Sequence, residues 1–333
     1  MQVCLLKSNK GARFHFGESV SFSEKDEINA LHSTTHYLYA DTLFSAIINA
    51  WALKNPHTLE NFISVCKKGY FKISSGFYCI KTKQKTVFFL PKPVSLNLLY
   101  NNDSKKIKRI KLISSGIWEK GLLPNDWFDS EKCTLLQNDT MVALKEEINY
   151  NISVYEIITT PKVNVRTENK KESYYLQTDL YMLGDEDNTV YWYFLMEKQL
   201  DRDLEKHLSE ALQTFIHLGI GGDRSAGGGA LKEFEIRDFS LNINSSNYTA
   251  GFSPVIPIKN ELTKRCLYYV KKRGSQNRKV GKLMPMYHVL QEGAVLNPDI
   301  KGQIISLNEN PPILRYGINF SFPLHNNFVK GIL

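Results

Sequence analysis

The spacing of apolar positions predicts three helices. Residues 41–53, 57–69 and 202–218 repeat apolar side chains every three to four positions, which is typical of a helix that buries one face. In the last of these segments the buried face is expected to consist of Leu204, Leu208, Ala211, Leu212, Phe215 and Ile216. Asp41 or Thr42 is a suitable N-cap for the first helix.

Alternating and continuous apolar runs predict the strands. Residues 1–9 and 12–18 alternate well enough for two strands, and the pattern over 70–100 is β throughout. In the segment 161–196, two alternating runs flank the polar turn TENKKES and predict a hairpin. The continuous apolar run TVYWYFLM follows and predicts a strand that is buried on both faces. A last strand is expected over 230–239.

The order of these elements is strand, helix, strands, hairpin, strand, helix, strand, which predicts an α+β fold. Read coarsely, it is the β-α-β-β-α-β order of ferredoxin-like and RNA-recognition domains. We expect this domain over residues 1–240, with a loop-rich insertion at about 101–140, where no period is evident. Residues 241–333 have weaker signals and suit a smaller, degenerate ferredoxin-like domain.

Between the last helix and the last strand lies a glycine-rich loop. Six glycines fall between Gly219 and Gly229, with Asp223, Arg224 and Ser225 among them. Glycine permits positive φ and close approach of backbone N–H groups, which can surround phosphate oxygens, and arginine can add a bidentate contact. The loop contains no GxGxxG or GxxxxGK[ST] and follows a helix, whereas nucleotide-binding loops of those types follow a strand. The sequence favours a phosphate site of another kind, with a flexible connector as the alternative.

The positive charge of the chain is concentrated near its C-terminus. The net charge of the 333 residues is +8, and residues 241–333 contain 12 Lys and Arg against 4 Asp and Glu, which is the whole excess. Nine of these basic residues lie in 259–282, and a second basic cluster, KKIKRIK, covers 105–111. Such clusters attract nucleic acid or anionic lipid, although a solvated surface would explain either cluster alone.

Membrane and secreted classes are not indicated. The chain has no run of about 18 uncharged apolar residues, which a membrane-spanning helix needs. Its start lacks the long apolar core of a secretory signal. Its five cysteines are scattered, odd in number and without a CxxC pair. These features predict a cytoplasmic protein with free thiols.

Three segments together resemble the RAMP superfamily of CRISPR proteins, and within it the Cas-five-like group. They are YADTLFSAIINAW at 39–51, GIGGDRSAGGGALKEF at 219–234, and KKRGSQ at 271–276 followed by GKLMPMYHVLQEGAVL at 281–296. The first two are fairly specific as a pair, and the third is less so. Residues 101–140 contribute nothing to the resemblance.

The resemblance implies a non-catalytic subunit that binds CRISPR RNA in the type III-A (Csm) effector complex of antiviral defence. Such a subunit grips the 5′ handle of the CRISPR RNA and joins the large Cas-ten-type subunit to the backbone RAMP subunit, the third Csm subunit. It also extends a β-hairpin, the thumb, into the guide–target duplex. The matching hairpin here is expected at about 161–185. No cofactor, metal or membrane is implied.

The expected RNA contacts fall in three parts of the chain. They are Gly219, Gly221, Gly222, Asp223, Arg224, Ser225, Gly227, Gly228 and Gly229 in the glycine loop, Lys162, Arg166, Tyr174 and Tyr175 in the thumb hairpin, and Lys271, Lys272 and Arg273 in the basic segment. Lys170 and Lys171 are further candidates in the hairpin. Basic residues beside aromatic ones suit phosphate binding with base stacking, whereas strand packing is the alternative for the tyrosines.

Some RAMP relatives cleave RNA, which requires acid–base groups around a 2′-hydroxyl. His15, His32 and His36 lie near the first strand and helix, and His217 adjoins the glycine loop. Asp41 lies near the position of the cleaving aspartate in the backbone RAMP subunit, but we favour an N-cap role for it over catalysis. His32 and His36 have no nearby Glu or cysteine pair, so we expect no metal site. The alternatives to a non-catalytic RNA-binding subunit are a Cas-six-like endoribonuclease that processes CRISPR RNA precursor, and a scaffold without RNA contact.

Overall fold

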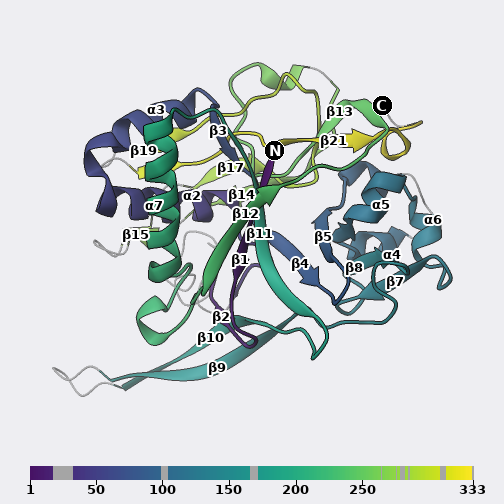
Figure 1. Ribbon diagram of the computed structural model, residues 1–333, viewed down its shortest axis with the longest axis horizontal. Helices are drawn as coiled ribbons and strands as arrows, with labels where there is room; N and C mark the ends of the chain where they lie inside the picture. Colours follow the sequence, from purple (N-terminus) through teal and green to yellow (C-terminus); the bar gives the residue numbers. More distant parts are fainter. Residues whose placement is uncertain are drawn as a thin grey trace.

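The computed structural model describes residues 1–17, 33–98, 104–165, 172–263, 265–274, 276–277, 282–283, 286–307 and 313–331. Its main layer is a nine-stranded mixed sheet (Figure 1). The strands are β1 (Gln2–Lys7), β3 (Phe71–Ile73), β4 (Phe77–Lys81), β5 (Thr86–Pro91), β6 (Leu112–Ser114), β7 (Cys133–Leu136), β8 (Met141–Leu144), β11 (Thr189–Lys198) and β12 (Glu233–Asp238). They are ordered β12-β1-β11-β4-β5-β6-β8-β7, and β3 pairs with β11 off this path. The α+β class expected from the sequence is therefore confirmed.

The three expected helices are present and lie on the same side of the molecule (Figure 1). They are α2 (Ala40–Lys54), α3 (Leu59–Lys67), which follows the 3₁₀ turn η1 (Pro56–Thr58), and α7 (Arg202–Leu218). All six apolar residues expected on the inner face of α7 are buried. The start of α2 differs from the expectation, because its N-cap is Tyr39, whose side chain makes no capping hydrogen bond. Neither Asp41 nor Thr42 is the cap; instead, the hydroxyl of Ser75 accepts from the Ala40 amide at 3.0 Å.

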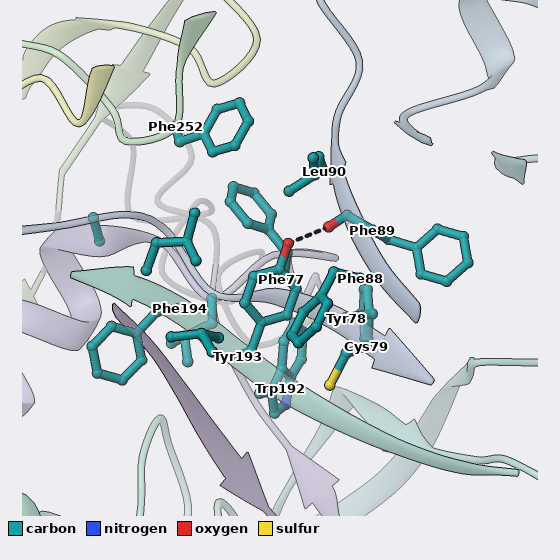
Figure 2. Close-up of a cluster of buried hydrophobic side chains, with 14 of the residues drawn as sticks. Phe77, Tyr78, Cys79, Phe88, Phe89, Leu90, Trp192, Tyr193, Phe194 and Phe252 are labelled. Atoms are coloured by element: carbon teal, nitrogen blue, oxygen red, sulfur yellow. Dashed lines mark hydrogen bonds between the residues drawn. The ribbon is translucent and has the colours of Figure 1, made fainter. Parts of the chain in front are cut away.

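A cluster of buried hydrophobic side chains lies where β11 pairs with β4 and β4 pairs with β5 (Figure 2). Trp192 stacks on Tyr78 with ring centroids 4.3 Å apart, and the hydroxyl of Tyr193 donates to the Phe89 carbonyl at 2.8 Å. Because Trp192, Tyr193 and their neighbours from Phe194 to Met196 are all buried, this strand is covered on both faces, as its continuous apolar run predicts.

The expectation of a loop-rich insertion at 101–140 is wrong. This region contains α4 (Ser104–Arg109), α5 (Ser115–Lys120) and α6 (Pro124–Trp127), and with β6, β7 and β8 it extends the main sheet beyond β5. Trp118 and Trp127 are fully buried in it. Elements of three to six residues are too short to show a period, which is why the sequence pattern did not reveal them.

The C-terminal part is built from short strands. These are β13 (Ser245–Gly251), β14 (Val270–Arg273), β15 (Gln276–Asn277), β16 (Lys282–Leu283), β17 (Tyr287–Leu290), β18 (Val295–Leu296), β19 (Ile305–Leu307), β20 (Ile313–Arg315) and β21 (Ser321–His325). Phe252, Tyr316 and Phe322 join the same hydrophobic cluster as the main sheet. The domain boundary near residue 240 stays a prediction. Within the described residues, no helix is both long and apolar enough to cross a membrane.

The expected hairpin is present and starts earlier than residue 161. It consists of β9 (Tyr155–Val165) and β10 (Glu172–Met182), and β2 (Arg13–Phe14) completes a separate three-stranded sheet in the order β2-β10-β9. The hairpin runs below the main sheet and projects past α7 and the loop that follows it (Figure 1). This position brings β10 close to the glycine-rich loop.

Candidate nucleic-acid interface

The glycine-rich loop starts at the C-terminal end of α7 and has the backbone that its sequence predicts. Within this loop, φ is positive at four glycines, Gly219, Gly221, Gly227 and Gly229. It is also positive at one residue that is not glycine, Asp223, whose φ is 56°. A side chain at position 221 would lie 2.6 Å from the carbonyl oxygen of His15, so glycine is required there for close approach as well as for conformation.

Backbone hydrogen bonds fix this loop to β2 and to itself. Gly229 donates to the Arg13 carbonyl at 2.6 Å, and Gly222 donates to the His15 carbonyl at 2.8 Å. Ile220 donates to the Gly229 carbonyl at 2.9 Å, which closes the base of the loop. The loop is thus a defined structure and not a flexible connector. These bonds also mean that several glycine amides already have acceptors within the protein.

A smaller group of amides remains for a ligand. In the described part of the chain, no carbonyl accepts from the amides of Gly221, Asp223, Arg224 or Ser225. The Arg224 side chain is exposed, and among the described residues it has no hydrogen-bond or ion-pair partner. It lines an open hollow of about 540 Å³ together with His217, Leu218, Asp223 and Ser225. The hollow therefore combines a free guanidinium with free backbone donors, the arrangement that an anion requires.

Asp223 connects the loop to the hairpin. Its Oδ2 accepts from Lys162 Nζ at 2.7 Å and from Gln177 Nε2 at 2.8 Å, and it lies 3.8 Å from Arg13 Nη2. The hydrogen bond from Lys162 is the main reason that the pKa of Asp223 lies below its ordinary value. Asp179, which is buried, accepts in turn from Gln177 at 2.9 Å and from Arg13 at 3.2 Å. This network holds the hairpin in a fixed position relative to the loop.

The two faces of the hairpin differ. Lys162, Gln177 and Asp179 share the face that contacts the glycine loop. The opposite face carries exposed apolar side chains. They are Ile157 (37% exposed), Val163 (46%), Leu176 (44%) and Tyr174 (74%). Tyr174 lies opposite Val163 in the register, and Tyr175, on the other face, lies opposite Lys162. Strand packing therefore does not account for Tyr174, which contacts little of its own chain. The candidates Arg166, Lys170 and Lys171 lie outside the described residues.

The basic segment is anchored at a different place, against α2. Arg273 is buried, and its Nη2 lies 2.6 Å from Oδ1 of Asp41 and 2.8 Å from Oδ2. Tyr287 donates to the same carboxylate at 2.9 Å. Burial by itself would raise the pKa of Asp41, but the Arg273 guanidinium and the Tyr287 hydroxyl reverse this and hold that pKa below its ordinary value. Arg273 is therefore not available to RNA.

The two basic residues before Arg273 differ in exposure. Lys271 is partly buried and donates to the Tyr39 hydroxyl at 3.1 Å. Lys272 points to the surface. Of the three basic residues expected to contact RNA in this segment, Lys272 is the most accessible.

Comparison with known proteins gives a consistent result. No family model matches the chain. A curated protein of Thermococcus onnurineus (strain NA1), "CRISPR system Cms protein Csm4", is 23% identical over 295 residues, which cover 88% of this chain and 93% of that protein. The crystal structure of a Csm3–Csm4 subcomplex in the type III-A CRISPR-Cas interference complex contains a chain of similar fold. Its TM-score is 0.70 at 19% identity, and the match covers 98% of this chain and 100% of that one. The chain thus resembles Csm4 in both sequence and fold.

A second structural relative supports the Csm4-like fold. The crystal structure of a Csm1–Csm4 cassette in complex with cA4 contains a chain that matches with a TM-score of 0.58 at 17% identity, over 98% of both chains. These structural matches establish the fold of this chain over nearly its whole length, including the 101–140 region.

The candidate catalytic histidines that the structure describes have different surroundings. His15 is buried, and its Nδ1 lies 2.8 Å from the Thr178 carbonyl oxygen, so that this nitrogen carries the proton. The ring of His36 lies against that of Tyr155, with centroids 5.5 Å apart. His217 is exposed at the hollow, and His32 lies outside the described residues. No group of His, Cys, Asp and Glu within the described residues is suited to hold a metal ion.

Sequence reasoning missed the residues that hold the loop and the hairpin together. Arg13, Gln177 and Asp179 lie far apart in sequence, and no motif includes them. Asp179 and Gln177 do interrupt the apolar pattern of β10 at positions that prove to be buried. A polar residue at a buried strand position needs a partner, and this was the available signal.

Proposed function

We propose that the chain is a non-catalytic RNA-binding subunit of a type III-A (Csm) effector complex, and that the hollow beside Arg224 holds phosphates of the 5′ handle of the CRISPR RNA. The observation that carries this proposal is the exposed Arg224 guanidinium beside the free amides of Asp223 and Ser225. Charged and backbone donors that converge in this way are suited to phosphate oxygens. The similarity to Csm4 supports the choice of RNA.

The remaining parts of the proposal follow from the fold. We take the unit formed by β1, α2, β4, β11, α7 and β12 as the ferredoxin-like core, because its elements follow the β-α-β-β-α-β order and its four strands are neighbours. The hairpin is the proposed thumb, with Tyr174 as its stacking side chain at the guide–target duplex. The proposed protein partners are the large Cas-ten-type subunit and the third Csm subunit, which the Csm1–Csm4 and Csm3–Csm4 structures suggest.

Arg224→Ala tests the proposed phosphate site. The loss of one charged contact is expected to weaken binding about 10-fold or more, and to lower the dependence of log K on log salt by about 0.7, the value for one phosphate of a single strand. Binding is measured between the purified chain and CRISPR RNA, with and without its 5′ handle, over a salt titration. The effect is expected only when the handle is present.

Arg202→Ala is the matched control for Arg224→Ala. Arg202 is also exposed and lies at the opposite end of α7, about 25 Å away for a helix of this length. Both variants should unfold at the wild-type temperature, because neither side chain is buried. If Arg224→Ala binds the handle with wild-type affinity at every salt concentration, the proposed site is wrong. Cleavage of repeat RNA by the isolated chain, lost on changing His15 or His36, would instead favour the ribonuclease.

A further inference from the structure

The basic cluster at 105–111 lies near one aromatic residue of the segment 259–282, Tyr269, at a place that the glycine loop does not involve. Ile107 of α4 is buried, as is Ile110 just after the helix, whereas Lys105 and Lys108 of α4 and Lys111, two residues past its end, are exposed. Within the described residues, none of these three lysines has a carboxylate at ion-pair distance. The exposed side of this segment is therefore a row of uncompensated charges.

Lys92 shows how positive this region is. It is buried beneath α4, where its Nζ donates to the carbonyl oxygen of Ile107 and to Oδ1 of Asn97. Burial lowers the pKa of Lys92 to about 7, and the nearby charges of Lys111 and Lys108 add to the shift. An ammonium group in this position has neutral acceptors but no anion. A bound anion at the surface would offset part of the free-energy cost of keeping this buried ammonium group charged.

Asn97 connects this region to the segment 259–282. Its Nδ2 donates to the hydroxyl of Tyr269 at 3.5 Å, and the Tyr269 carbonyl accepts from the Gln291 amide at 2.9 Å. Tyr269 is 50% exposed, and a chain of hydrogen bonds through Asn97 and Lys92 links it to Ile107 of α4. Lysines next to an accessible aromatic ring are the usual components of a surface that binds single-stranded nucleic acid, because phosphates meet the charges and bases stack on the ring.

We propose that Lys105, Lys108, Lys111 and Tyr269 form a second binding surface for single-stranded RNA, separate from the hollow beside Arg224. Residues three apart on a helix have Cβ atoms about 5–6 Å apart, so Lys105 and Lys108 form a short row that can follow a phosphodiester chain. The ammonium groups act as point charges and read no sequence, whereas an acidic protein partner would be matched better by the bidentate geometry of arginine. The surface contributes to affinity for RNA of any sequence.

The test uses the full chain and a labelled single-stranded RNA of about 12 nucleotides without the handle, within the site size of such surfaces. Binding is followed by fluorescence anisotropy between about 50 and 200 mM salt. Lys108→Gln/Lys111→Gln is expected to lower the slope of log K against log salt by about 1.4, which corresponds to two phosphates of a single strand. Tyr269→Ala is expected to weaken binding, and Tyr269→Phe to retain it, because phenylalanine keeps the stacking ring.

Lys67→Gln/Lys68→Gln is the control, since it removes the same charge from two exposed lysines at the end of α3. An equal loss in the control would show that only net charge matters and would overturn the proposal. Wild-type RNA binding by Lys108→Gln/Lys111→Gln would also overturn the proposal. If this variant in addition lost a partner subunit in co-purification, the surface would be a protein interface. All measurements are repeated with Arg224→Ala, so that the effects of the two surfaces are separated.

Discussion

The buried pair of Asp41 and Arg273 is expected to hold the C-terminal hairpin of β14 and β17 on the N-terminal end of α2. Arg273→Met keeps an unbranched apolar stem but removes the guanidinium. Asp41 would then be a buried carboxylate whose remaining donors are neutral: the Tyr287 hydroxyl and the amide and hydroxyl of Thr42. The side chains of the pair are 11% and 9% exposed, so solvent cannot replace the missing charge.

The expected cost is large. Removing one partner of a buried ion pair destabilises a protein by about 3–5 kcal/mol. An unfolding entropy of about 2.1 cal/mol/K per residue gives about 0.7 kcal/mol/K for a chain of this length, so that 4 kcal/mol lowers the Tm by about 6 °C if the chain unfolds as one unit. The measurement is the Tm by scanning calorimetry. Lys272→Met is the matched control, because it makes the same change at the adjacent exposed position of β14.

Two further measurements separate this explanation from a general loss of packing. In the double variant Asp41→Asn/Arg273→Met no buried charge remains, so its Tm should lie above that of Arg273→Met alone. Asp41 has a lowered pKa in the wild type, so its stabilisation is present above its unfolded pKa of about 3.9 and is lost as the pH falls through its folded pKa. The difference in Tm between wild type and Arg273→Met should therefore narrow as the pH falls below about 4. If Arg273→Met and Lys272→Met have the same Tm at pH 7, the pair does not stabilise the fold.

Four other variants test the loop and the buried lysine. Asp223→Asn keeps a residue type that tolerates positive φ but weakens the link to Lys162, so the hairpin amides should exchange hydrogen faster by mass spectrometry. Gly227→Ala should lower the free energy of unfolding by about 1–2 kcal/mol, because the φ of this residue is 80° although no atom lies within 4 Å of a new Cβ. Gly229→Ala should lower it further, because its Cβ would also overlap the Ile220 carbonyl. Urea denaturation of both variants measures the difference. The pKa of Lys92 is about 7 in the folded chain, which is below its unfolded value. The Tm of the wild type should therefore rise between pH 7 and about 10, as the folded chain loses this proton more readily than the unfolded chain. Lys92→Met should not show this rise in the same buffers.

The sequence was sufficient for the elements that follow a clear period. The helix over 202–218 was predicted to the residue, because its apolar face repeats without interruption. The buried strand β11 was equally clear from its continuous apolar run. These segments are decided by local burial alone, which a single sequence displays.

Features that depend on contacts between distant residues could not be predicted. Nothing near Asp41 in the sequence indicates that Arg273 binds it, since the two are 232 residues apart. In the same way, Arg273 looked like its exposed neighbour Lys272, and only the pairing of β14 with β17 decides which of the two faces inward. The glycine loop was located from sequence, but the identity of its free amides depends on carbonyl groups supplied by β2.

The alternation of side chains along β10 has a practical consequence for protein engineering. Each even-numbered position from 174 to 176 faces away from the glycine loop, and each odd-numbered position from 175 to 179 faces the loop or its partners. Substitutions at the even-numbered positions would therefore change what the hairpin binds. Substitutions at the odd-numbered positions would weaken its attachment to the glycine loop. A library restricted to the outward set would explore new specificities while the chain keeps its own architecture intact.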